Sequence, residues 1–325
     1  MYESYYGFHA QPFQLRPDPD FLYGSKGHKR ALAYLDYGLA RGEGFIVVTG
    51  EVGAGKTTLL RHLLRTLPSD KIYAAQIATT QLDADDLLRM VAAAFELPYD
   101  GLSKAALLSN IGQLLQHLDR QGKRALLVID EAQNLSARAV EELRMLSNFQ
   151  TSDRALLQTF LLGQPEFRKT LMSPGMEQLR QRVTATFHLG PMEEAETRRY
   201  IEHRLATVGW SGRPSIDAAG FAAIHAASGG VPRRINTLCD RLLLMGYLEE
   251  IDQFGAAHVQ TVVDDLAHEF AVPQEAGGTA AAAPADSAAL DGMEARIAGI
   301  ERSILSMLDA MKSLVGQRNS QREHP

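Results

Sequence analysis

A glycine-rich stretch between an apolar run and a helical pattern is the clearest sign of chemistry in this sequence. It reads GEVGAGKTT and follows the apolar run Phe45–Thr49 directly. The spacing Gly-x4-Gly-Lys-Thr in that context is typical of a phosphate-binding loop, whose backbone N–H groups and following helix N-terminus bind phosphate oxygens. We therefore expect the phosphate groups of a nucleotide to bind along this loop, which comprises Gly50, Glu51, Val52, Gly53, Ala54, Gly55, Lys56, Thr57 and Thr58.

Side chains at two places would complete a site for hydrolysis. In such a loop Lys56 bridges the β- and γ-phosphates, and the Thr57 hydroxyl holds Mg²⁺. The run ALLVIDE brings Asp130 and Glu131 to the end of an apolar strand, beside the loop in a parallel sheet. Asp130 suits the magnesium shell, and Glu131 suits a general base that deprotonates water. The alternative is that these acids cap the helix that follows.

Polar groups further along the chain are weaker candidates. The apolar run Leu156–Leu162 ends at Gly163 and Gln164. If this strand lies between the loop strand and the acidic strand, Gln164 can hydrogen-bond the attacking water; otherwise it is a turn residue. Arginine stabilises charge on a transferring phosphoryl group, although exposed arginines are usually only solvated. The candidate arginines are Arg180 and Arg182 before a later strand, and Arg233 and Arg234 at the start of a helix.

The elements that must position these residues alternate between short apolar runs and longer helical patterns. Such alternation predicts an α/β fold with a parallel sheet covered by helices. The expected strands are Phe45–Thr49, Ile72–Ala78, Ala125–Ile129, Leu156–Leu162 and Ala185–Leu189. From Glu193 to Phe270 only helical periodicities remain, so a second, all-helical domain is expected, with Cys239 on the buried face of a helix.

The end of the chain differs in composition from the rest. Residues 271–289 are rich in Ala, Gly and Pro, which is typical of a linker. Residues 290–318 then repeat apolar residues at steps of three and four, a heptad seam that predicts a coiled-coil-like helix. The seam is Leu290, Met293, Ile297, Ile300, Ile304, Met307, Met311 and Leu314. It either folds back on its own domain, pairs with itself or binds a partner.

The whole chain sets limits on partners. Its 325 residues carry a formal charge of −6, which gives no global electrostatic reason to expect nucleic acid. The start lacks a basic segment followed by an apolar core, and no apolar run is long enough to span a membrane. We expect a cytoplasmic protein, peripheral to the inner membrane only through partners.

These motifs together resemble the AAA+ ATPases. The likeness rests on the phosphate loop, Asp130-Glu131, Gln164, the segment LRQR ending at Arg182, and Gly-Val-Pro-Arg233. It implies ATP and Mg²⁺ as cofactors, a homo-oligomer, a five-stranded P-loop core over residues 44–191 and a helical lid over residues 192–270. It also implies that Arg182, helped by Arg180, reaches the ATP of a neighbouring subunit, and that Arg233 senses the γ-phosphate from the lid.

The aromatic-rich start, residues 1–43, carries a closer resemblance. With EVGAGKTT, DEAQNL and LLGQPE it is similar to general secretion pathway protein A and to the secretion ATPases of exosortase (PEP-CTERM) and exopolysaccharide loci. The resemblance implies secretion or polysaccharide-export partners at the inner membrane. It also implies that this arm wraps the adenine side of the site, with Tyr23 and His28 nearest; the alternative is a packed arm.

Three functions compete at this point. The first is an oligomeric ATPase that drives or regulates assembly of an envelope secretion system. The second is a DNA-handling ATPase of the transposition-helper or initiator kind, which needs a basic surface, whereas Asp252–Phe270 is acidic. The third is a binding switch that holds ATP and hydrolyses it slowly.

Overall fold

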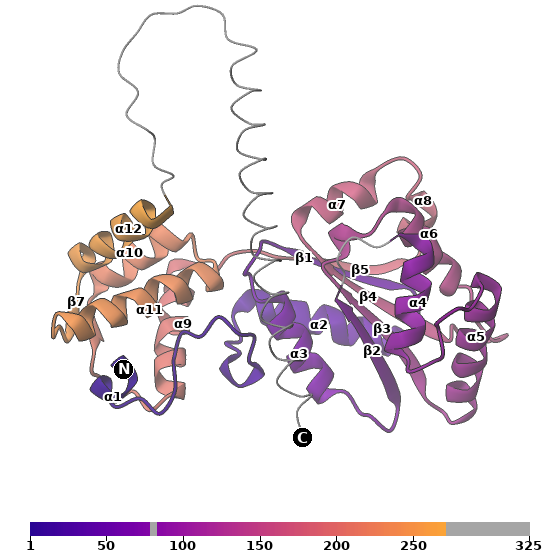
Figure 1. Cartoon of the computed structure of the whole chain (residues 1–325), viewed down its shortest axis with the longest axis horizontal. Coiled ribbons are helices and arrows are strands. Elements are labelled where there is room, and N and C mark those ends of the chain that lie inside the picture. Colours follow the sequence, from indigo (N-terminus) through magenta and orange to yellow (C-terminus); the bar gives the residue numbers. More distant parts are fainter. Residues whose placement is uncertain (79–82, 271–325) are drawn as a thin grey trace, which may run out of the picture. The chain divides into compact units, whose positions relative to one another are not determined.

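The computed structural model describes residues 1–78 and 83–270 (Figure 1). The chain separates into two units, residues 1–270 and 271–325. The predicted linker and heptad helix lie in the second unit, outside the described residues.

A five-stranded parallel sheet forms the centre of the first unit (Figure 1). Its order is β2-β3-β4-β1-β5. The strands are β1 (Phe45–Gly50), β2 (Ile72–Ala78), β3 (Arg124–Asp130), β4 (Leu157–Gly163) and β5 (Val183–Leu189). The predicted α/β fold and all five strands are confirmed. β4 lies between β1 and β3, which is the arrangement that brings Gln164 beside both the loop and the acidic pair.

Helices cover both faces of the sheet because the central strands are apolar on both faces. All positions of β1, β3 after its first residue, and β4 are buried. Alternate residues of β1 point to opposite faces of the sheet. Ile46 packs with α2 (Lys26–Arg41) and α3 (Lys56–Thr66) on one face, and Val47 packs with a second group of helices on the other. That group comprises α4 (Ala84–Ala94), α5 (Lys104–Arg120), α6 (Ala137–Leu146), α7 (Pro165–Met172) and α8 (Glu177–Arg180).

Within the described residues, four helices follow β5 and form the helical part of the chain. They are α9 (Glu194–Thr207), α10 (Ala218–Ser228), α11 (Pro232–Leu248) and α12 (Ala256–Phe270). Cys239 is buried on α11, as predicted. The expectation of helices alone was wrong in one detail, since β6 (Ser215–Ile216) pairs with β7 (Gln253–Phe254). Strands of two residues are too short to produce a period-two pattern.

The N-terminal arm packs on these helices. It contains α1 (Tyr2–Tyr6) and the 3-10 helix η1 (Pro19–Phe21), and its aromatic rings share one core with Ile201 and Leu242. The Tyr6 hydroxyl donates to the Ile251 carbonyl oxygen over 2.9 Å. The arm and the helical part therefore fold together, and the boundaries at residues 43 and 191 stay predictions. Within the described ranges no helix has the length and apolar character needed to cross a membrane.

Candidate nucleotide-binding site

The glycine-rich loop has the backbone shape that its glycines permit. It links β1 to α3, and Gly53 and Gly55 have φ values of 83° and 96°, in the left-handed region that favours glycine. A Cβ on Gly53 would lie 2.3 Å from the Arg233 Cβ, and one on Gly55 would lie 2.7 Å from the His28 Nε2. Both positions therefore require glycine for conformation and for space.

Lys56 is held inside the loop. Its side chain is buried, and its Nζ donates to the carbonyl oxygens of Gly50 over 2.7 Å and Glu51 over 3.0 Å. Burial lowers the pKa of the Lys56 ammonium, while the nearby carboxylates of Glu131 and Asp130 act in the opposite direction. The loop thus presents a cation that has lost much of its water, which strengthens its attraction for an anion.

Thr57 and Asp130 meet where α3 begins and β3 ends. The Thr57 Oγ1 donates to the Asp130 Oδ2 over 2.8 Å, and Asp130 is buried. These hard oxygen donors fit Mg²⁺, which commonly takes one or two protein ligands and completes its shell with water and substrate phosphates. In the part of the chain that the structure describes, no three His, Cys, Asp or Glu side chains gather into a metal cluster. The Thr57 hydroxyl and the Asp130 carboxylate could hold a Mg²⁺ ion whose other ligands are water and nucleotide phosphates.

Two glutamines hold the carboxylate of Glu131. The Gln133 Nε2 donates to the Glu131 Oε2 over 2.6 Å, and the Gln164 Nε2 donates to the same oxygen over 3.3 Å. The Gln164 N–H donates to the Gln133 Oε1 over 2.9 Å. Glu131 also has a φ of 57°, in the left-handed region that Glu96 and Glu250 adopt elsewhere in the chain. The structure places Gln164 beside Glu131, and its contact with an attacking water stays a prediction. Gln133, in the 3-10 turn η2 (Ala132–Asn134), was missed as a residue of the site.

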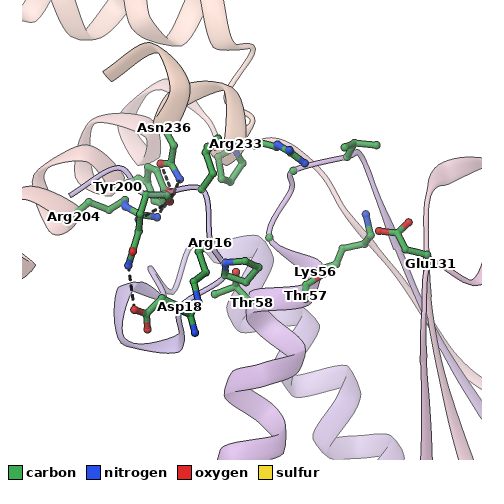
Figure 2. Close-up of a pocket in the computed structure, with 17 residues that line it drawn as sticks. Arg16, Asp18, Lys56, Thr57, Thr58, Glu131, Tyr200, Arg204, Arg233 and Asn236 are labelled. Carbon is green, nitrogen blue, oxygen red and sulfur yellow. Dashed lines mark hydrogen bonds between the residues drawn. The ribbon is translucent and has the colours of Figure 1, made fainter. Parts of the chain in front are cut away.

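The start of α11 docks directly on the loop. The Arg233 backbone N–H donates to the Gly53 carbonyl oxygen over 3.1 Å. A cleft opens between the loop, the arm and the helical part, and Arg233 lines it together with Lys56, Thr57 and Glu131 (Figure 2). The structure thus gathers the loop, the acidic strand end and Arg233 around one cavity.

A buried polar network forms the arm side of the cleft. Arg204 donates from Nε to the Pro12 carbonyl oxygen over 2.5 Å, and its guanidinium lies 4.8 Å from the centre of the Phe21 ring. The Tyr200 hydroxyl accepts from the Arg204 Nη1 over 3.0 Å and lies 2.7 Å from the Asn236 side-chain amide. No motif marks this network in the sequence, because it joins Tyr200 and Arg204 of α9 to Asn236 of α11 and to the arm.

Tyr23 and His28 do not line this cleft. The ring of Tyr23 packs against Tyr200 and His203, with ring centres 6.0 and 5.7 Å apart. His28 lies behind the loop, where its Nδ1 is 2.8 Å from the Ser25 Oγ. Burial lowers the pKa of His28 to about 4, against opposing effects of Glu196 and of a backbone hydrogen bond to Ala54. Their packing favours the alternative of a packed arm over contact with the adenine side of the cleft.

The arm reaches the cleft instead through a different segment. Residues 14–18 line it, including Leu15, Arg16 and Asp18 (Figure 2). The packed aromatic residues of the arm position this segment. Tyr23 had been proposed for contact with adenine because it is aromatic, but its ring belongs to the packed part of the arm. An apolar side chain such as Leu15, which is more than half exposed, is the better candidate for contact with a base.

The two arginines before β5 lie at the opposite end of the sheet from the loop. The Arg182 carbonyl oxygen accepts from the Phe45 N–H over 2.9 Å, at the start of β1. The loop follows the other end of this strand, roughly 17 Å away at about 3.3 Å per residue. Arg182 therefore does not serve the loop of its own chain. Arg180 donates to the carbonyl oxygens of Leu171 and Ser173 over 2.8 and 3.2 Å, which ties α8 to the end of α7.

The fold and the site together define a class. A five-stranded parallel sheet of this order, with a phosphate loop after β1 and an acidic pair after β3, is the P-loop AAA+ fold. Residues 40–171 match the family model described as an AAA domain. Solved structures with the same fold include ORC2 of Aeropyrum pernix (17% identity, TM-score 0.59, 79% of this chain and 72% of that one). They also include Cdc6p of Pyrobaculum aerophilum, which is 19% identical with a TM-score of 0.60. That match covers 76% of this chain and 70% of Cdc6p.

A particular relative narrows the class. The chain is 41% identical over 249 residues to general secretion pathway protein A of Aeromonas hydrophila. The match covers 76% of this chain and 45% of the relative, so the chain spans less than half the length of that protein. The chain thus resembles general secretion pathway protein A over a stretch that includes the AAA domain.

Proposed function

We propose that this protein hydrolyses ATP as an oligomer and uses the turnover to drive or regulate assembly of an envelope secretion system. The observation that carries the proposal is the hydrogen bond of 2.8 Å between Thr57 and Asp130, with Glu131 beside it on the same cleft. This contact joins a phosphate loop to an acidic strand end, which is the pairing that phosphoryl transfer requires.

Each side chain then has a separate task. Lys56 binds the β- and γ-phosphates, and the Glu131 carboxylate accepts a proton from the attacking water. Gln164, 3.3 Å from that carboxylate, orients the same water by a hydrogen bond. Mg²⁺, held by Thr57 and Asp130, would neutralise the charge that develops on the phosphate oxygens. The products are ADP and inorganic phosphate.

Arg233 and Arg182 extend the site beyond the core. Arg233 begins α11 against Gly53, so its guanidinium is suited to sense the γ-phosphate from the helical part and to couple lid movement to turnover. Arg182 faces away from the loop of its own chain, and a neighbouring copy is the partner to which an arginine at this edge can contribute. ATP-dependent assembly of a homo-oligomer follows from this assignment.

The proposed role in secretion rests on sequence similarity to a secretion protein. General secretion pathway protein A is the relative with 41% identity, and the further association with exosortase and exopolysaccharide systems rests on the motifs of the sequence. Recruitment of inner-membrane secretion proteins by residues 290–318 belongs to the same proposal. The similarity to ORC2 and Cdc6p concerns the fold, and α12 carries Asp264, Asp265 and Glu269, which does not favour a DNA-binding surface there.

The test is ATP turnover by the purified full-length protein over a range of protein concentrations. We expect turnover per subunit to rise with concentration, and Lys56→Ala and Glu131→Gln to lower it by at least 100-fold. Wild-type turnover no higher than that of Lys56→Ala would leave only an ATP-binding switch. Light scattering of the full chain and of residues 1–270, with and without ATP and Mg²⁺, separates assembly through the core from assembly through the tail.

A further inference from the structure

The guanidinium of Arg182 is held by two side chains at the end of α6. Its Nη1 donates to the Ser147 Oγ over 2.5 Å, and its Nη2 donates to the Asn148 Oδ1 over 2.5 Å. Ser147 is the C-cap residue of α6, and Asn148 follows it. Both acceptors are uncharged, and the Glu141 carboxylate, which also interacts electrostatically with Arg182, is paired with Arg144. A phosphate oxygen can displace them, because a guanidinium–phosphate pair adds the attraction of opposite charges and allows two parallel hydrogen bonds.

The other end of α6 begins at the loop that carries Glu131. The Asn134 N–H donates to the Glu131 carbonyl oxygen over 3.0 Å, and the Ser136 Oγ then caps α6 by accepting from the Ala139 N–H over 3.1 Å. The ten residues of α6 span about 15 Å at the usual helical rise. Its buried residues Val140 and Leu143 fix it against the sheet. The end of α6 is therefore a rigid support.

We propose that Ser147 and Asn148 are positioning residues that orient Arg182 toward nucleotide bound by a second copy of this chain. The inference rests on the proposed oligomeric ATPase. An arginine side chain has many rotamers, and ordering it in advance lowers the entropy lost when it contacts a transferring phosphoryl group. The surface around it is open to a neighbouring copy, since a pocket there is lined by Arg182, Arg41, Glu43 and Gln150.

The experiment measures ATP turnover of the full-length protein. The variants are Arg182→Ala, the double variant Ser147→Ala/Asn148→Ala, and Asn148→Asp, whose carboxylate retains the guanidinium in an ion pair. Ser109→Ala is the matched control, because it removes an exposed hydroxyl from α5. We expect kcat of the double variant and of Asn148→Asp to fall at least tenfold. Their KM for ATP, their melting temperatures and the kcat of Ser109→Ala should stay at the wild-type values.

A mixing experiment separates positioning from damage to the fold. The Glu131→Gln protein lacks the general base but keeps Arg182 with both of its supports. Added in excess to the double variant, it should raise turnover per intact active site several-fold, because each variant site receives a well-held arginine from its neighbour. Glu131→Gln/Arg182→Ala added in the same way should give no increase.

The results distinguish the inference from the proposed function. If Arg182→Ala keeps wild-type turnover at every protein concentration, both the action of Arg182 between subunits and its positioning are overturned. If Arg182→Ala loses turnover while the double variant and Asn148→Asp keep it, only the positioning role is overturned. Loss in the double variant that the Glu131→Gln protein does not restore also overturns that role.

Discussion

The backbone N–H of Arg233 and the carbonyl oxygen of Gly53 form a hydrogen bond of 3.1 Å that joins the first turn of α11 to the phosphate loop. The proline at the start of α11 contributes no N–H, so Arg233 supplies one of the free donors that a helix N-terminus offers. The loop and the helical part are therefore in contact at the cleft itself, and a movement of either would displace the other.

Gly53→Ala should disrupt this junction. Its Cβ would lie 2.3 Å from the Arg233 Cβ, and alanine would have to adopt a φ of 83°. We expect nucleotide affinity to fall at least tenfold, measured with a fluorescent ATP analogue. Gly101→Ala is the control, because Gly101 also has a positive φ, of 66°, but a Cβ there meets no atom within 4 Å. Equal losses of affinity in both variants would contradict the role of the contact with Arg233.

Gln133→Ala should lower turnover, although Gln133 was given no role of its own when the segment DEAQNL was recognised in the sequence. Its amide donates to the Glu131 carboxylate over 2.6 Å and its Oε1 accepts from the Gln164 N–H. Without it the general base loses its orientation, and we expect kcat to fall about 10- to 100-fold, with little change in nucleotide affinity. Gln113→Ala on the exposed face of α5 is the control. A change confined to KM would assign Gln133 to binding instead.

Much of the fold and of the loop could be predicted because their signals are local. Gly50 to Thr58 follow one another in the chain, and the apolar runs of the five strands need no distant partner to be recognised. The position of Gln164 depended on strand order, which the sequence left conditional and the sheet satisfies. Contacts between distant segments were not predictable: Arg204 with Pro12, for example, joins residues 192 positions apart.

Arg204→Leu tests that distant contact. Arg204 is buried, and it donates to the carbonyl oxygens of Pro12 and Gln14, which leucine would leave without their partner. We expect a loss of about 2 to 4 kcal/mol in the free energy of unfolding, measured by urea titration. The arm should also become sensitive to protease near residues 12–18. The control Arg198→Leu removes an exposed ion pair with Glu202, for which a change below about 1 kcal/mol is expected.

His28 should make stability depend on pH in a defined direction. Its pKa in the folded protein is about 4, below the usual value of 6.5, because burial disfavours the charged ring. The unfolded chain therefore binds the proton more readily, so this contribution is complete above pH 6.5 and is lost as the pH falls toward 4. A shift of this size corresponds to roughly 3 kcal/mol at about 1.4 kcal/mol per pKa unit.

The measurement is the free energy of unfolding at several pH values between 7 and 4, for the wild type and for His28→Gln. Glutamine does not titrate, so the curve of the variant should be flatter than that of the wild type over this range. The control His117→Gln replaces an exposed ring on α5, away from the phosphate loop. Parallel curves for the wild type and His28→Gln would contradict a buried neutral ring behind the phosphate loop. A flatter curve accompanied by weaker nucleotide binding would show that the same ring supports the loop at Gly55.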